Sequence, residues 1–226
     1  MQWEQLTSRD FKKAVKDTGV CVIAMGVLEK HSEHLPLGND FLNGHKIACL
    51  AADKEPAVVF PPFYFGQIYE ARSFPGCLTI KPTLLLELIE AVCDEIGRNG
   101  FKKIMPYNAH GGNWSLLNFL AQCSLWADKP YQVYTPASFI TASRNKAWDA
   151  LLDTKMHGHA CECETSVSLA NHPELVHMDR VPKKPAFPLK RMKHLEGIGT
   201  GSWWYADHPD HYAGDAVHPS HPRLIE

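Results

Sequence analysis

The feature that most constrains the fold of this chain is a regular alternation of strand-type and helix-type segments over its first two thirds. Strands are predicted from short apolar runs at residues 20–25, 58–60, 77–80, 101–107 and 131–135. Helices are predicted beside them, at about residues 7–17, 39–52, 82–99, 114–127 and 138–152. Alternation of this kind is typical of an α/β protein with a parallel sheet that helices cover on both faces.

Length and tail composition together predict one domain over residues 1–226. A chain of 226 residues can bury roughly 70% of its unfolded surface in a single core, and no linker divides it. From about residue 182 onward, Pro, Lys, Gly and Trp dominate and no periodicity holds. The tail is therefore predicted to be irregular and to pack over the site or against a neighbouring subunit.

Composition excludes several classes of partner. No segment approaches the roughly 20 continuous apolar residues that span a bilayer, and the polar N-terminus does not resemble a secretory signal. A net charge of -2 gives no electrostatic case for binding nucleic acid or an anionic membrane. Seven cysteines, an odd number mostly within apolar segments, indicate reduced thiols. We therefore expect a cytoplasmic protein.

Metal-ligand side chains crowd the loop after the first predicted strand. Glu29 and His31 lie two residues apart, so in extended backbone both side chains can point to the same side. Asp40 follows at the start of the next helix. Sites in open α/β sheets lie at the carboxyl ends of strands, which favours a functional reading of this loop. Taken alone, the stretch is equally compatible with a solvated loop that carries surface histidines.

A second segment places Asn108, His110 and Asn113 around two glycines, between a predicted strand and a predicted helix. Glycines permit a close approach of the backbone there. In a third segment, His159 and Glu162 are expected at positions i and i+3 on one face of a helix, with Glu164 about half a turn beyond.

The three segments supply imidazoles and carboxylates and need no thiolate. This is the ligand set of a hydrolytic two-metal site that holds zinc, manganese or iron. The ligand chemistry alone fits a two-metal phosphoesterase as well as an amidase. Against the phosphoesterase, no cluster of Arg or Lys near the motifs is available to clamp a phosphate.

The three motifs resemble those of the creatininase (creatinine amidohydrolase) family. They read Glu-x-His-x-x-His-Leu-Pro-x-x-x-Asp, Asn-x-His-Gly-Gly-Asn and His-Ala-x-x-x-Glu-Thr-Ser, in the family's order over the first three quarters of the chain. The resemblance implies a three-layer α/β/α sandwich with a mostly parallel central sheet. It also implies a homo-oligomer, usually a hexamer built from dimers, and hydrolysis of a C–N amide-type bond with two divalent metal ions.

Carried onto this chain, the resemblance implies that Glu29 and His110 hold one metal ion, that His31 holds the other and that Asp40 bridges the two. Zinc is the expected metal, with manganese and iron as alternatives. Asn108 and Asn113 are expected to fix the His110 loop by hydrogen bonds.

One ligand position departs from the creatinine-hydrolysing pattern. That enzyme has a carboxylate two residues after the second-motif histidine, where this chain has Gly112. The wider family shares the Gly-Gly form, and there the resemblance implies a carboxylate from the third motif. We expect Glu164 to be this ligand, with Glu162 as the alternative. His159 is the expected proton shuttle to the leaving nitrogen, and Glu162 is expected to orient it or relay protons.

The substrate loop departs further. The family commonly has Gly-x-Ser-x-x-His before Phe-Pro-Gly-Thr, whereas this chain has Gly66, Ile68 and Ala71 before Phe-Pro-Gly-Cys. Other replacements of usual family residues are Ser32, Glu33, Ala109 and Cys161. Ligands are kept while substrate-contacting positions differ, which predicts an amidohydrolase for a small amide or lactam other than creatinine. The same departures leave open a metal-stabilised scaffold or binding protein that has lost turnover.

The tail carries further candidates. Trp203 and Trp204 form either an aromatic wall on the pocket or an anchor at a subunit interface. Most tail histidines are expected to be solvated, with the alternative that one enters a neighbour's site: His194, His208, His211, His218 and His221.

Overall fold

The computed structural model describes residues 1–136 and 150–217, which divide into two compact units. The sheet unit comprises residues 1–28, 40–68 and 78–136, and the loop unit comprises residues 29–39, 69–77 and 150–217. Because these stretches interleave along the chain, no single cut in the sequence separates the two units. The first motif is divided between the two units, whereas the second lies in the sheet unit and the third in the loop unit.

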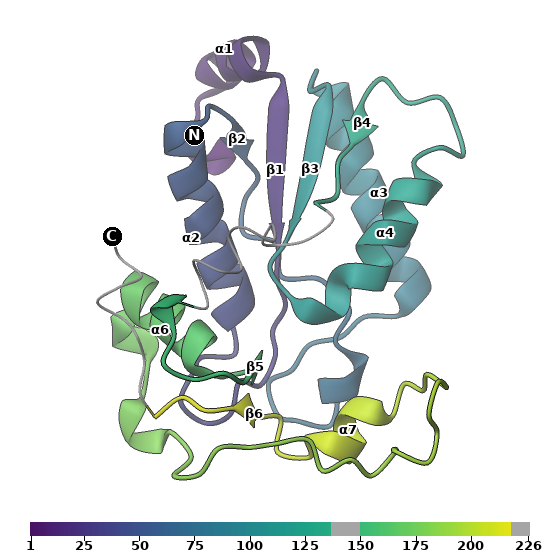
Figure 1. Cartoon of the computed structure of the whole chain (residues 1–226). Helices are drawn as coiled ribbons and strands as arrows, with labels where there is room; N and C mark the ends of the chain where they lie inside the picture. Colours follow the sequence, from purple (N-terminus) through teal and green to yellow (C-terminus); the bar gives the residue numbers. More distant parts are fainter. Residues whose placement is uncertain (137–149, 218–226) are drawn as a thin grey trace. The chain divides into compact units, whose positions relative to one another are not determined.

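Four parallel strands form the centre of the sheet unit, in the order β2-β1-β3-β4 (Figure 1). Their bounds are Val20–Met25 for β1, Val58–Val59 for β2, Lys103–Asn108 for β3 and Gln132–Val133 for β4. The longest pairing joins β1 to β3 over their full lengths. The predicted parallel sheet is confirmed.

Helices cover both faces of this sheet (Figure 1). Their bounds are Ser8–Thr18 for α1, Asn39–Lys54 for α2, Pro82–Arg98 for α3 and Trp114–Cys123 for α4. Alternate residues of β1 point to opposite faces. Cys21, Ile23 and Met25 pack in one apolar cluster with α1, α3 and α4, whereas Val22 and Ala24 pack with α2. The sheet unit is therefore an α/β/α sandwich, as expected.

Local sequence signals set several of these boundaries. The Thr7 hydroxyl accepts the N–H of Asp10 at the start of α1, and Gly19 ends that helix in the left-handed region at φ +62°. The strand predicted at residues 77–80 is wrong, because Leu78 makes only an isolated antiparallel bridge to Leu28. The helix predicted at residues 138–152 falls largely outside the described residues.

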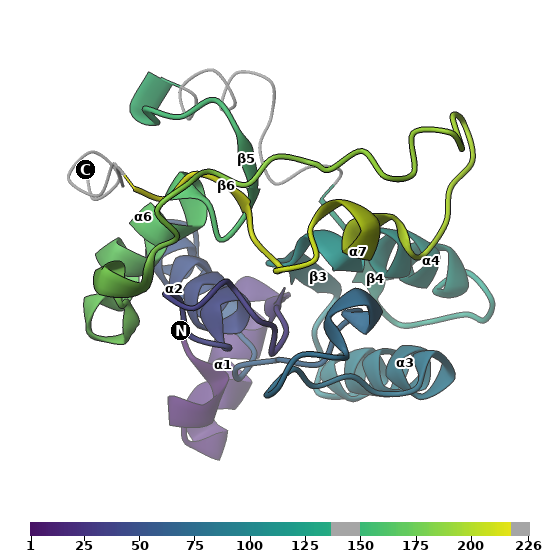
Figure 2. The ribbon, with the colours of Figure 1, turned by 90° about the horizontal axis from the view of Figure 1, so that it is seen from below.

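The loop unit contains a two-stranded antiparallel sheet, which Figure 2 shows with β5 beside β6. Its strands and α-helices are β5 (His157–His159), α6 (Glu162–Asn171), α7 (Trp203–Asp207) and β6 (Ala213–Gly214). The prediction that His159 lies on a helix is wrong. It ends β5, paired with Ala213, and Ala160 at φ +51° turns the chain before α6 begins.

Short 3₁₀ helices complete the described secondary structure: Trp3–Gln5, Tyr69–Ala71, Gly111–Asn113, Pro173–Leu175 and Met178–Arg180. No helix among the described residues is long and apolar enough to cross a membrane. All seven cysteines lie in the described parts of the chain, and none of them forms a disulfide.

Candidate metal centre

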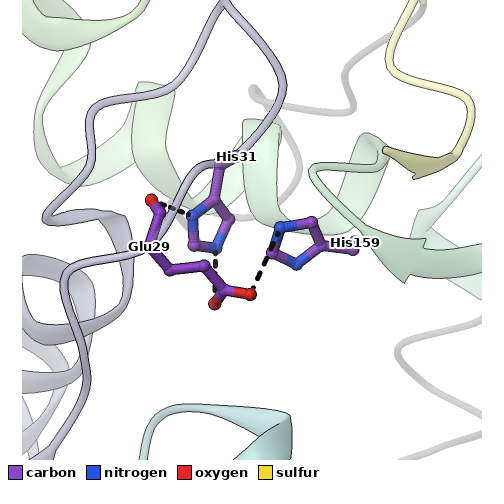
Figure 3. Close-up of side chains that lie close together, drawn as sticks. All are labelled: Glu29, His31 and His159. Atoms are coloured by element: carbon purple, nitrogen blue, oxygen red, sulfur yellow. Dashed lines mark hydrogen bonds and ion pairs between the residues drawn. The ribbon is translucent and has the colours of Figure 1, made fainter. Parts of the chain in front are cut away.

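Three predicted site residues come together in the loop unit: Glu29, His31 and His159 (Figure 3). His31 Nε2 lies 4.0 Å from one carboxylate oxygen of Glu29, and His159 Nε2 lies 3.6 Å from the other. Each residue offers one ligand-type atom within 4.8 Å of the other two, and all three side chains are buried. Zinc bonds such atoms at about 2.0–2.2 Å, so a cation placed between them is compatible with separations of this size.

Hydrogen bonds assign the tautomers of the two histidines. A carbonyl oxygen only accepts, so His31 Nδ1, at 3.1 Å from the Glu29 carbonyl, must donate. In the neutral ring this leaves the lone pair on Nε2, the atom that faces the carboxylates. By the same reasoning, His159 donates its Nε2–H to the Lys30 carbonyl at 2.7 Å and has its lone pair on Nδ1. Metals bind the neutral imidazole through such a lone pair.

His159 is neutral near pH 7. Burial of the ring lowers its pKa to about 3, although the nearby charge of Glu29 opposes this shift. A neutral, buried imidazole can accept a proton or bind a cation. Its expected role as a proton shuttle stays a prediction.

The two third-motif carboxylates have different surroundings. Glu164 Oε2 lies 3.9 Å from His31 Nε2 and accepts the N–H of Ala160 at 2.5 Å. The buried carboxylate of Glu162 accepts the backbone N–H groups of Asp153 and Thr154, at 2.9 and 2.7 Å. The geometry therefore favours Glu164 over Glu162 as a ligand, and gives Glu162 a role in holding the segment before β5.

Of the four described non-glycine residues with positive φ, three lie beside the candidate ligands, and the fourth is Lys190. Ser32, Ala160 and His211 adopt φ values of +55°, +51° and +54°, in the left-handed region that favours glycine. Ser32 follows His31, and Ala160 follows His159. Such conformations cost of order 1–3 kcal/mol each and are concentrated at functional sites.

The sheet unit holds the other two predicted ligands, Asp40 and His110, as a buried pair. Asp40 lies in the first turn of α2, His110 follows β3, and their Oδ2 and Nδ1 atoms are 2.8 Å apart. His110 donates its Nε2–H to the Gln67 carbonyl at 2.9 Å, so Nδ1 carries the lone pair in the neutral ring. Nδ1 is thus the atom available to a metal, directly beside a carboxylate.

Gly112 is required by this arrangement. A Cβ at position 112 would lie 2.5 Å from His110 Nε2 and 2.7 Å from the main-chain oxygen of Gln67. Any side chain there would displace the backbone that fixes the His110 ring. The carboxylate ligand of the creatinine-hydrolysing pattern therefore has no room at this position.

Two asparagines secure the second motif. The Asn108 side chain accepts the His110 N–H at 3.1 Å. Asn113 donates to the Met25 carbonyl at 3.1 Å and accepts the Gln67 N–H at 2.8 Å. Asn113 thereby ties the end of β1, the Gln67 loop and the second motif together.

One buried contact was not expected from the sequence. His211, in the irregular tail, is 1% exposed and lies with Nε2 2.7 Å from Glu29 Oε1. The two residues are 182 positions apart, so no local spacing signals the contact. The nearby Trp-Trp pair was the available hint, since Trp204 contacts His159 and His211.

A cavity of about 530 Å³ lies within the loop unit. Its walls come from the first-motif loop, through Lys30 and Ser32, and from tail residues 182–189 and 207–212. Glu29, His31 and His159 do not line it. The tail therefore borders the ligand-bearing loop and leaves room beside it for a small molecule.

Comparison with known proteins connects these motifs to one family. The creatininase family profile, described as creatinine amidohydrolase, matches residues 4–220. The chain is 26% identical over 186 residues to 3-dehydro-scyllo-inosose hydrolase of Thermotoga maritima, covering 78% of this chain and 58% of that protein. It is 24% identical over 201 residues to creatinine amidohydrolase of Pseudomonas putida, covering 80% and 75%.

Similarity extends to a peptidase and to solved structures. Mycofactocin precursor peptide peptidase of Mycobacterium ulcerans is 27% identical over 183 residues, covering 76% of this chain and 66% of that protein. A mutant creatininase of Zn-Zn type superposes with a TM-score of 0.81 at 20% identity, covering 99% of this chain and 92% of the other. A manganese creatininase superposes with a TM-score of 0.79 at 18% identity, covering 99% of this chain and 92% of the other.

Proposed function

The chain belongs to the creatininase family, and we propose that it is a metal-dependent amidohydrolase for a small amide or lactam other than creatinine. The observation that carries the proposal is the buried cluster of Glu29, His31 and His159, in which the Glu29 carboxylate and the Nε2 lone pair of His31 suit a divalent cation beside the neutral imidazole of His159. The relatives named above act on chemically different substrates, so family membership alone does not define the substrate.

We propose that two divalent metal ions are held by five residues: Glu29, His31, Asp40, His110 and Glu164. Support comes from the motif order and from the donor atoms, which are neutral imidazole nitrogens and carboxylate oxygens. Zinc is the first choice and manganese the second, since the similar creatininases include zinc and manganese forms, and iron remains compatible with the ligand set. Asp40 is the proposed bridging ligand.

Each proposed residue has a defined task. The metal, when bound, polarises the substrate carbonyl and lowers the pKa of water toward neutrality. His159, with its Nε2–H committed to the Lys30 carbonyl, accepts a proton at Nδ1 and passes it to the leaving nitrogen. Glu162 supports it indirectly, by fixing Asp153 and Thr154 ahead of β5.

The substrate positions support a substrate other than creatinine. Ile68 and Ala71, at the sites of the Ser and His of the family loop, are both completely buried. They contribute to packing and offer no polar group to a ligand. Together with the steric requirement for Gly112, they change both the ligand set and the recognition loop relative to the creatinine-hydrolysing pattern.

Turnover assays with and without metal test this function. Protein stripped with a chelator is expected to hydrolyse members of a panel of small amides and lactams only after Zn²⁺ or Mn²⁺ is restored. Metal-restored cleavage of phosphomonoesters instead would identify a two-metal phosphoesterase. Bound metal with no turnover across both panels would identify a metal-stabilised binding protein and overturn the proposal.

A further inference from the structure

The tail of the chain reaches the Glu29 carboxylate through two side chains. Trp204, at the start of α7, donates its Nε1–H to His211 Nδ1 at 2.9 Å. His211 Nε2 lies 2.7 Å from Glu29 Oε1. All three residues belong to the loop unit, and both His211 and Glu29 are buried.

The direction of both hydrogen bonds follows from the donors available. An indole nitrogen only donates, so His211 Nδ1 must accept and carries the lone pair. The proton of the neutral ring is then on Nε2, where it is donated to Glu29. Trp204 thus selects the one neutral tautomer of His211 that can hold a carboxylate.

The backbone around His211 is arranged to keep this ring in place. His211 adopts φ +54°, an unfavourable value for a residue other than glycine. Its N–H is donated to the His208 carbonyl, and its own carbonyl accepts the N–H of Ser32, next to His31. The aromatic rings of Phe74 and Trp204 lie 5.2 and 5.7 Å from the imidazole.

We propose that His211 is a positioning residue for the metal ligand Glu29, with Trp204 fixing its tautomer. This inference rests on the proposed function, in that Glu29 is taken as a ligand. The Nε2–H of His211 fixes one oxygen of Glu29, which orients the carboxylate and leaves Oε2, the oxygen nearer His31 Nε2, to bond the metal. Removal of such an outer partner typically lowers metal affinity 10- to 100-fold.

Zinc titrations of the metal-stripped full chain against a competing chelator test the pair. His211→Phe is expected to weaken Zn²⁺ binding at least about 10-fold. Trp204→Phe keeps a ring against His159 and His208 and removes only the N–H donor, so it should weaken binding by less. Trp203→Phe is the matched control and should bind as wild type, because Trp203 is exposed and a phenylalanine ring keeps its edge-on packing against Trp204.

Combining the substitutions distinguishes a positioning role of His211 from a general loss of stability. Because Trp204 acts through His211, the double variant with Trp204→Phe and His211→Phe should bind Zn²⁺ as weakly as His211→Phe alone. In a Glu29→Gln background, His211→Phe should have no further effect. Imidazole nitrogen NMR of the wild type should show His211 protonated on Nε2, and Trp204→Phe should mix the two tautomers.

Wild-type zinc affinity in His211→Phe, additive effects of the two substitutions, or a His211 proton on Nδ1 would each overturn the inference. So would a wild-type chain that binds no zinc. Binding is measured without substrate, so the two proposals fail separately. If the substitutions have the expected non-additive effects on zinc affinity but the chain hydrolyses no amide, His211 is still a positioning residue and only the proposed amidohydrolase function is contradicted.

Discussion

At the scale of single residues, hydrogen bonds to main-chain carbonyls determine which ring nitrogen of each histidine carries the lone pair. His31, His110 and His159 each give an N–H to a carbonyl, at Glu29, Gln67 and Lys30. Two of these carbonyls belong to the first-motif loop itself. The loop therefore carries proposed ligands and also orients them, an arrangement typical of metal-binding histidines.

The roles of Glu164 and His159 can be separated by substitution. Glu164→Gln is expected to weaken metal affinity roughly 10-fold or more, because a neutral amide replaces a carboxylate beside His31. His159→Ala is expected to keep the metals and to lose roughly 10² to 10⁴ in turnover, the range for loss of a general acid-base. Metal content and hydrolysis are measured while metal is titrated back into each variant.

Rescue of His159→Ala by excess metal would mean that His159 is a ligand, a role that its place beside Glu29 and His31 also allows. Full metal affinity in Glu164→Gln would make Glu162 the next residue to test. Its carboxylate already accepts two backbone N–H groups, so a ligand role would require those contacts to change.

Protonation of His34 is expected to lower the stability of the fold in mild acid. Burial, followed by the nearby His31, lowers its pKa from 6.5 to about 4, and its Nδ1 has no hydrogen-bond partner among the described residues. Between pH 6.5 and 4 the unfolded chain binds this proton more readily than the folded one, so folding stability rises with pH. The stabilisation is complete above pH 6.5 and is lost toward pH 4, by at most about 3 kcal/mol.

Urea unfolding of the metal-free protein across this range measures the effect. His34→Asn removes the titrating group and should flatten the pH dependence relative to wild type, whatever its effect on absolute stability. Equal slopes for both proteins between pH 6.5 and 4 would show that His34 does not titrate as expected.

At the scale of elements, one small-residue contact sets the distance between α2 and the second motif. A Cβ on Gly44, inside α2, would lie 2.4 Å from the Cβ of Ala109. Ala109 replaces a residue that is usually glycine in the family. The absence of a side chain at Gly44 leaves room for the Ala109 methyl group. The close approach places Asp40, one turn earlier on α2, beside His110.

This contact gives a reciprocal prediction. Gly44→Ala alone should destabilise the protein by about 1–3 kcal/mol through overpacking, although alanine favours a helix interior. Adding Ala109→Gly should return the stability to within about 1 kcal/mol of wild type. Thermal or urea unfolding measures both, and a stabilising Gly44→Ala would contradict the packing described here.

Periodicity and capping predicted most elements of the sheet unit because those signals are local. Thr7 and Gly19 bound α1 as expected, and β1 runs from Val20 to Met25 as its apolar run predicts. His159 was misplaced because its strand depends on pairing with Ala213, a partner more than 50 residues away. The candidate ligands could be proposed from the sequence because metal chemistry restricts ligands to a few residue types.

At the scale of the whole molecule, contacts between segments far apart in the chain could not be predicted from the sequence. The His211–Glu29 hydrogen bond joins residues 182 positions apart, and the histidine-rich tail has no periodicity from which to infer it. The same holds for the cavity beside Lys30, whose walls come from the first motif and from the tail. Such features depend on the final packing of irregular backbone.

The oligomer remains a prediction from the family resemblance. Light scattering at micromolar concentration is expected to give a multiple of the 25.4 kDa chain, most simply six-fold. Trp203 is 52% exposed in the single chain, as expected of an interface anchor, and Trp203→Ser should weaken the assembly. A 25.4 kDa species alone would contradict the prediction.

Anomalous scattering from crystals of the metal-loaded protein tests the two-metal centre most directly. Data collected at the zinc, manganese and iron edges should show two peaks per subunit, bonded at about 2.0–2.3 Å by Glu29, His31, Asp40, His110 and Glu164. Asp40→Ala crystals should lose both peaks, because a bridging carboxylate serves both cations. A single peak or none in the wild type, or two full peaks in Asp40→Ala, would contradict the proposed centre.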